Sequence, residues 1–110
     1  MKPVVTIGLA FGLPNSAIEQ ILGILGEYPE VLTVWLFGSR AKGNFRQGSD
    51  IDLCLEAPNL TLSRRLEIEN RLDDLLLPWQ IDLIARHEID NPALLAHISR
   101  HGAILAAAKS

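Results

Sequence analysis

The sequence has a single cysteine, few aromatic residues, no long apolar run and slightly fewer basic than acidic side chains. Cys54 alone cannot form an internal disulfide, which fits a reducing cytoplasm, and we expect it to be a buried, inert thiol rather than a nucleophile. A net charge of −3 argues against sequence-independent nucleic-acid binding, which depends on dense lysine and arginine. No stretch approaches the ~20 apolar residues of a membrane span. We therefore expect a soluble cytoplasmic protein without nucleic-acid or membrane partners.

The 110 residues are enough for one domain but not for a separate substrate domain. Residues 1–13 are expected to form a flexible leader or an edge strand over 4–9, and residues 14–110 the folded domain. Apolar periodicity predicts helices near 14–27, 62–76 and 91–102, and strands at 31–37, 50–55, 79–84 and 103–105. This order predicts an α+β fold, with a small mixed sheet and helices packed mainly on one face.

A glycine-serine pair and two aspartates stand out between the strands predicted at 31–37 and 50–55. Gly38 permits a tight turn, and Ser39 supplies a hydroxyl at the start of a short helix, where free backbone N–H groups bind phosphate. Asp50 and Asp52 share one face of their strand, because side chains alternate along a strand. Two carboxylates about 7 Å apart in an apolar setting repel, so they protonate or recruit a cation such as Mg²⁺. The combination predicts phosphoryl or nucleotidyl transfer.

Each part of this pattern also has a plain structural interpretation. Gly-Ser turns are common in loops, and an Asp-x-Asp pair is common on the solvated face of a strand. A solvated strand gives no reason for the glycine turn before it, so the combination favours a phosphate-handling site. Asp82 lies in the middle of the strand predicted at 79–84, where a charge needs a partner. If this strand lies beside the one at 50–55, Asp82 lies close to Asp50 and Asp52. Otherwise it is a residue of an edge strand.

The segment from Gly38-Ser39 to Asp50-Ile51-Asp52 resembles the signature of the polymerase-beta-like nucleotidyltransferase superfamily, in the form carried by the minimal nucleotidyltransferases. Asp82 matches the third carboxylate of that family. The resemblance covers roughly residues 14–102 and implies the family's α+β architecture. It implies that the three aspartates are catalytic and hold one or two Mg²⁺ ions. The nucleotide-binding residues expected from it are Gly38, Ser39, Arg40 and Ser49.

The resemblance also implies an activity and a partner. Minimal nucleotidyltransferases transfer a nucleotide, here AMP from ATP, to a hydroxyl, and many pair with a HEPN-domain toxin whose tyrosine they modify. The chain is therefore expected to be the antitoxin of such a pair, in a hetero-oligomer. Two alternatives are transfer to an antibiotic or metabolite hydroxyl, and a non-catalytic antitoxin that only binds its partner.

The remaining polar residues have ordinary interpretations. His97 and His101 lie four residues apart but have no third ligand for zinc, and Arg100 with His101 suits the C-terminus of a helix. His87 is expected to be a hydrogen-bonded loop residue. Arg40 and Lys42 either neutralise charge on the leaving group or are solvated, and the charged side chains of the helix at 62–76 are expected to face water.

Overall fold

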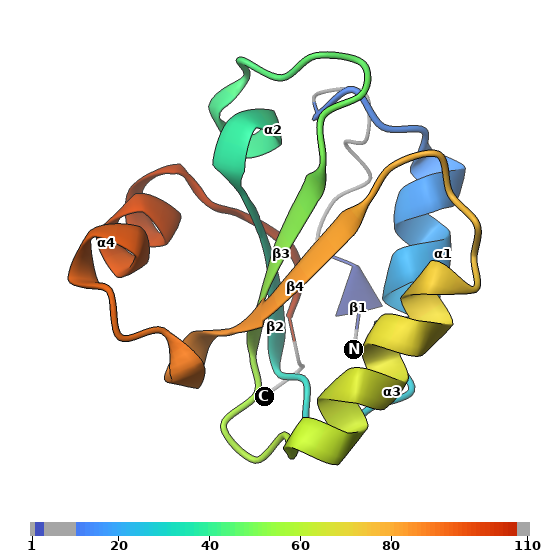
Figure 1. The fold of residues 1–110 in the computed structure, drawn as a ribbon, viewed down its shortest axis with the longest axis vertical. Coiled ribbons are helices and arrows are strands. Elements are labelled where there is room, and N and C mark those ends of the chain that lie inside the picture. Colours follow the sequence, from blue (N-terminus) through green and yellow to red (C-terminus); the bar gives the residue numbers. More distant parts are fainter. Residues whose placement is uncertain (1, 4–10, 108–110) are drawn as a thin grey trace.

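The computed structural model describes residues 2–3 and 11–107. They form a five-stranded sheet in the order β1-β5-β2-β3-β4 (Figure 1). The strands are β1 (Lys2–Pro3), β2 (Thr33–Phe37), β3 (Ile51–Glu56), β4 (Ile81–Ala85) and β5 (Ala103–Ala107). Three neighbouring pairs are antiparallel, whereas β3 and β4 are parallel. The sheet is therefore mixed, as the sequence predicts.

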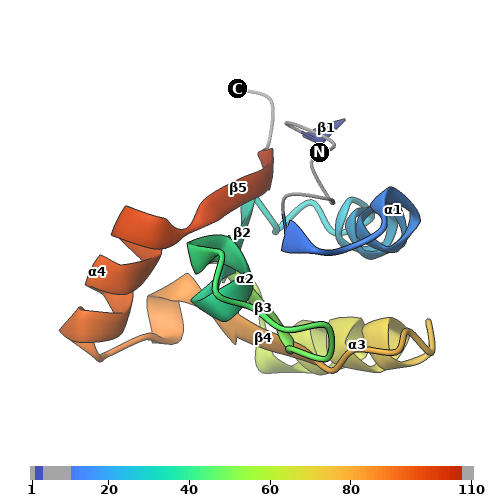
Figure 2. The same ribbon diagram turned by 90° about the horizontal axis from the view of Figure 1, so that it is seen from above.

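Two long helices, α1 (Asn15–Leu25) and α3 (Leu62–Asp73), cover one face of the sheet. Helix α4 (Pro92–His101) lies on the other side, next to β2, and the short helix α2 (Gly38–Lys42) sits at the end of the strands (Figure 2). A 3₁₀ turn, η2 (Arg86–Glu88), follows β4. None of the helices among the described residues is long and apolar enough to cross a membrane.

The hydrophobic core lies between the sheet and the helices α1 and α3. Helix α1 buries the apolar side chains of one face, and α3 adds Ile68. The strands contribute Val34 and Leu36 from β2, and Leu53 and Leu55 from β3. Each buried side chain of this size stabilises the fold by about 1.5–3 kcal/mol. Because side chains alternate along a strand, the intervening residues of β2 and β3 point to the opposite face, which carries the candidate site.

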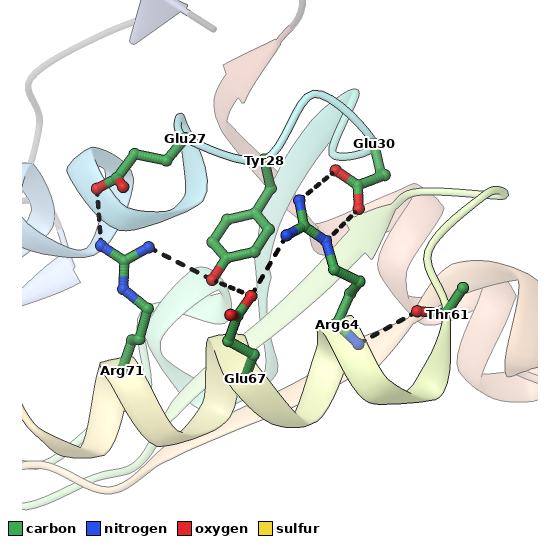
Figure 3. Close-up of polar contacts among 7 residues, drawn as sticks. All are labelled: Glu27, Tyr28, Glu30, Thr61, Arg64, Glu67 and Arg71. Atoms are coloured by element: carbon green, nitrogen blue, oxygen red, sulfur yellow. Dashed lines mark hydrogen bonds and ion pairs between the residues drawn. The ribbon is translucent and has the colours of Figure 1, made fainter.

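Tyr28 joins the end of α1 to α3. Its hydroxyl donates a hydrogen bond to Glu67 at 2.8 Å and accepts one from Arg71 at 3.3 Å. The guanidinium of Arg64 lies over the tyrosine ring, 4.5 Å from its centroid. Arg64 also forms an ion pair with Glu30, and Arg71 with Glu27, each at 2.7 Å (Figure 3). The prediction that the charged side chains of α3 face water is thus only partly correct, because two of its arginines bind the segment that follows α1.

Several element boundaries differ from the prediction. The strand predicted at 103–105 extends to Ala107 and lies inside the sheet between β1 and β2. Helix α1 begins at Asn15, with Pro14 at its N-cap, and α3 ends at Asp73. The possible edge strand at 4–9 lies outside the described residues, whereas Phe11 and Leu13 are buried in the core.

Candidate active site

The chain bends sharply where β2 ends. Gly38 has a φ of +75°, in the left-handed region that favours glycine, and it begins helix α2 directly after Phe37. The space where a Cβ atom would stand at Gly38 is filled by the Asp52 carboxylate. Glycine is therefore required here both by backbone conformation and by the close approach of an acidic side chain. Ser39, the next residue, is half-buried in the first turn of α2.

Asp52 lies between the bend and a second carboxylate. In the sheet it pairs with Phe37 of β2 on one side and with Asp82 of β4 on the other. Paired residues of neighbouring strands point to the same face, so Asp52 and Asp82 share the face away from the core. Asp50 does not lie in the strand as predicted, because β3 begins at Ile51, but its charge still acts on Asp52.

The electrostatics of this group follow from burial and crowding. Burial, then repulsion from Asp82 and Asp50, and then a hydrogen bond with Asp82 raise the pKa of Asp52 from 3.8 to about 6. No basic side chain in the described part of the chain forms an ion pair with any of the three acids. Gln80 Nε2 makes a weak contact with Asp82 Oδ1 at 3.5 Å, but this amide carries no charge. The site therefore has negative charge that a cation would balance.

The donor set fits Mg²⁺ held jointly with a substrate. Among the residues that the structure describes, no group of three or more His, Cys, Asp or Glu side chains is arranged to enclose a metal ion by itself. Mg²⁺ is usually held by one or two carboxylates together with substrate phosphates, rather than by a closed protein cage. Asp52 and Asp82, which are adjacent in the sheet and have no ion-pair partner among the described residues, supply such a pair.

Arg40 of α2 is buried rather than solvated. The residue is 1% exposed, and its guanidinium donates to the carbonyl oxygens of Phe11 at 2.7 Å, Ser49 at 2.9 Å and Gln47 at 3.3 Å. It also lies over the ring of Phe45, 5.2 Å from the centroid. The alternative of a solvated helix side chain is therefore wrong for Arg40. The residue fixes the loop that leads into the acid-bearing strand.

Ser49 and Trp79 complete the support of this loop. The Ser49 hydroxyl accepts a hydrogen bond from the Arg46 N–H at 2.8 Å, and Trp79 Nε1 donates to the Gln47 carbonyl at 3.0 Å. Ser49 thus closes a turn one residue before Asp50. Its predicted contact with a nucleotide remains a prediction.

Sequence reasoning missed the contact that α4 makes with the bend. The backbone N–H of Gly38 donates to His97 Nε2 at 3.3 Å, and the imidazole meets the Phe37 ring edge-on at a centroid distance of 6.4 Å. The two hydrogen-bonded residues are 59 positions apart, so no local pattern indicates the contact. The only signal was the spacing of His97 and His101, which placed both on one side of a helix.

Comparison with known families agrees with this geometry. The family model described as polymerase beta, nucleotidyltransferase matches residues 19–110. The chain belongs to this nucleotidyltransferase family. The resemblance drawn from the glycine-serine pair and the aspartates is thereby confirmed at the level of the family, and the chain is an enzyme of the nucleotidyltransferase class by descent.

Individual relatives and structures point the same way. A Methanocaldococcus jannaschii protein, named as a protein adenylyltransferase, is 37% identical over 82 residues, which are 70% of this chain and 83% of the relative. A chain of a toxin-antitoxin structure with AMP-PNP aligns at a TM-score of 0.68 and 24% identity, covering 84% of this chain and 74% of that chain. A chain of the Shewanella oneidensis complex of a tri-AMPylated HEPN toxin with an MNT antitoxin aligns at 0.64 and 22%, covering 84% and 71%. At these identities the two structures establish the polymerase-beta-like fold.

Proposed function

We propose that this nucleotidyltransferase moves AMP from ATP to a tyrosine hydroxyl of a HEPN-domain toxin and acts as the antitoxin of that pair. The observation that carries the proposal is the position of Asp52, against the Gly38 bend on one side and beside Asp82 on the other. The relative named as a protein adenylyltransferase supports a protein acceptor. The AMP-PNP complex and the AMPylated HEPN toxin support ATP as donor and the toxin as partner. We place this hetero-oligomer in the cytoplasm, where ATP is available and Cys54 stays reduced.

The three aspartates would hold the metal. Asp50, Asp52 and Asp82 would bind one or two Mg²⁺ ions, which supply positive charge for the triphosphate when bound. The Ser39 hydroxyl and the backbone of Gly38 would bind the outer phosphates. We assign Arg40 to holding the 43–50 loop rather than to contact with the nucleotide, because its donors already bind backbone carbonyls.

The reaction is an in-line displacement at the α-phosphorus. Asp82 accepts the proton of the attacking tyrosine hydroxyl, whose oxygen then bonds to the α-phosphorus. The bond from that phosphorus to the pyrophosphate oxygen breaks, so that AMP stays on the tyrosine and pyrophosphate leaves. Burial, and then repulsion from Asp82 and Asp50, raise the pKa of Asp52 to about 6, and a bound cation would favour its ionised form.

The test uses ATP labelled in its α-phosphate, a candidate HEPN protein and Mg²⁺. We expect label on the HEPN protein with the wild-type chain and a loss of at least about 100-fold with Asp50→Asn/Asp52→Asn. Undiminished labelling by the double variant would refute the assignment of the acids. Label that appears only in small products would favour the antibiotic or metabolite acceptor, and stable complex formation without label would favour a binding antitoxin.

A further inference from the structure

A cavity lies at the far end of the two strands that carry Asp52 and Asp82. Its volume is about 440 Å³, which is within the range of pockets that hold a small ligand or a side chain. It is formed by the end of β3, the turn that follows it, η2 with Ile89, and helix α4. The lining residues are Glu56, Ala57, Pro58, Arg86, His87, Ile89 and Leu95.

This cavity and the candidate active site lie on the same face of the sheet. Asp52, Cys54 and Glu56 alternate with buried residues along β3, so their side chains point to one side. Glu56 is four positions after Asp52, which corresponds to roughly 13 Å along the strand. The cavity is thus too far from the acids to hold the reacting hydroxyl, but it is within reach of a part of the same acceptor molecule.

The guanidinium of Arg86 is positioned to bind an acidic partner. It lies over the Trp35 ring, 5.8 Å from the centroid, and forms no hydrogen bond or ion pair with any described residue. The other half-buried arginines, Arg64, Arg65 and Arg71, each pair with a glutamate. The Trp35 Nε1 atom is also buried without a hydrogen-bond partner in the described part of the structure. A guanidinium held by stacking keeps its planar set of donors available for a carboxylate.

The other walls of the cavity define the rest of the ligand. Ala57, Pro58, Ile89 and Leu95 form an apolar surface suited to an aliphatic side chain. Glu56 lies on the same wall and makes no ion pair with Arg86. Its carboxylate is an acceptor for a backbone N–H of a bound peptide segment.

We propose that this cavity docks an extended segment of the acceptor protein, with an aliphatic side chain against the apolar wall and a neighbouring acidic side chain on Arg86. An extended chain advances about 3.3 Å per residue, so the docked pair would lie roughly four residues from the modified tyrosine. This inference rests on the proposed function, because it names how the acceptor of that reaction is held. It adds a determinant of acceptor specificity outside the acid site.

The test measures peptide binding without any nucleotide, so its result does not depend on transfer. Two fluorescently labelled peptides carry a tyrosine and, four residues further on, either Asp-Leu or Lys-Leu, and their affinities are measured by fluorescence anisotropy. We expect the wild-type chain to bind the Asp-Leu peptide about tenfold more tightly, and Arg86→Glu to prefer the Lys-Leu peptide. Arg100→Glu is the matched control, because this substitution makes the same change of charge at an exposed position of α4. It should keep the wild-type preference.

The two failures are distinguishable. Equal binding of both peptides to the wild-type chain, or the same preference in wild type and Arg86→Glu, would overturn the docking proposal. The reversal of preference by Arg86→Glu guards against unfolding, since an unfolded variant would bind neither peptide. If the charge preference behaves as expected but no acceptor is labelled from ATP, the docking site stands and the proposed function fails.

Discussion

The Asp52 carboxylate lies where a side chain at Gly38 would have to begin. The bend at the end of β2 and the central acid of the site are therefore in direct contact. Two strands meet at this point, because Phe37, directly before Gly38, is the sheet partner of Asp52. A change at the glycine must displace the acid, the backbone, or both.

Gly38→Ala should accordingly inactivate the enzyme more than it destabilises the fold. A positive φ costs a residue with a Cβ about 1–2 kcal/mol, and the methyl group also pushes Asp52 aside. We expect kcat/KM for AMP transfer to fall by at least about 100-fold with a folded protein remaining, as measured by labelled transfer and by thermal unfolding. Gly43→Ala is the control, since Gly43 has a φ of +85° but open space around its Cβ position. Equal losses of activity in both variants would show that strain alone, not the clash with Asp52, is responsible.

The raised pKa of Asp52 predicts a pH dependence of stability. Between pH 3.8 and about 6, Asp52 keeps a proton in the folded protein that the unfolded chain releases. The free energy of unfolding therefore falls as the pH rises through this window, and the stabilisation from protonated Asp52 is fully present only below it. After allowance for solvent screening the loss is on the order of 1–2 kcal/mol.

Urea unfolding of wild type and Asp52→Asn checks this dependence. Hydrogen bonds to arginines lower the pKa values of Glu27 and Glu30, so these two groups raise the stability of both proteins as the pH rises. Their effect is the same in wild type and variant, and the difference between the two stability curves therefore isolates Asp52. Asp52→Asn should gain stability relative to wild type as the pH rises from 4.5 to 7.5. Parallel stability curves would show that Asp52 titrates normally.

His97 should position the bend through its Nε2 acceptor. His97→Ala removes the acceptor of the Gly38 N–H, whereas His97→Gln offers an amide oxygen in a similar place. We expect about a fivefold loss of kcat/KM for the alanine variant, near 1 kcal/mol, and partial recovery for glutamine. His101→Gln, the neighbouring ring at a centroid distance of 5.3 Å, should behave as wild type.

Arg40 should act on stability and on loop order rather than on nucleotide contacts. Arg40→Lys cannot reach the carbonyls of Phe11, Gln47 and Ser49 together, and leaves some of them buried without a donor. We expect a loss of about 2–4 kcal/mol in the free energy of unfolding and faster hydrogen exchange over residues 43–50. Lys42→Met, at an exposed position of the same helix, should change stability by no more than about 0.5 kcal/mol. A stable Arg40→Lys protein with a weakened nucleotide affinity alone would contradict this assignment.

The sequence could predict the parts of the site that depend on short-range rules. Strand alternation and the β3-α3-β4 crossover are enough to bring Asp52 and Asp82 together, and a glycine-serine pair after an apolar strand indicates a bend. The family signature strengthens both predictions. Asp50 was placed inside β3 because the alternation was extended one residue too far.

The remaining features depend on contacts between distant segments. Arg40 looks like any polar residue of a short helix, and only the folded chain brings the Phe11 carbonyl to it. The His97 contact requires α4 to lie beside α2, on the side of the sheet opposite α1 and α3. The inner position of β5 could not be predicted, because an alanine-rich strand has little periodicity to distinguish a central strand from an edge.

The most direct measurement is calorimetric titration of a non-hydrolysable ATP analogue with Mg²⁺ into wild type, Asp52→Asn and Asp82→Asn. If the two adjacent carboxylates hold the metal-bound nucleotide, each substitution should abolish the Mg²⁺-dependent part of the affinity. Control substitution of Asp73, an exposed acid at the end of α3, by Asn should leave that part unchanged. Wild-type affinity for the Mg²⁺ complex in both Asp52→Asn and Asp82→Asn would contradict the account.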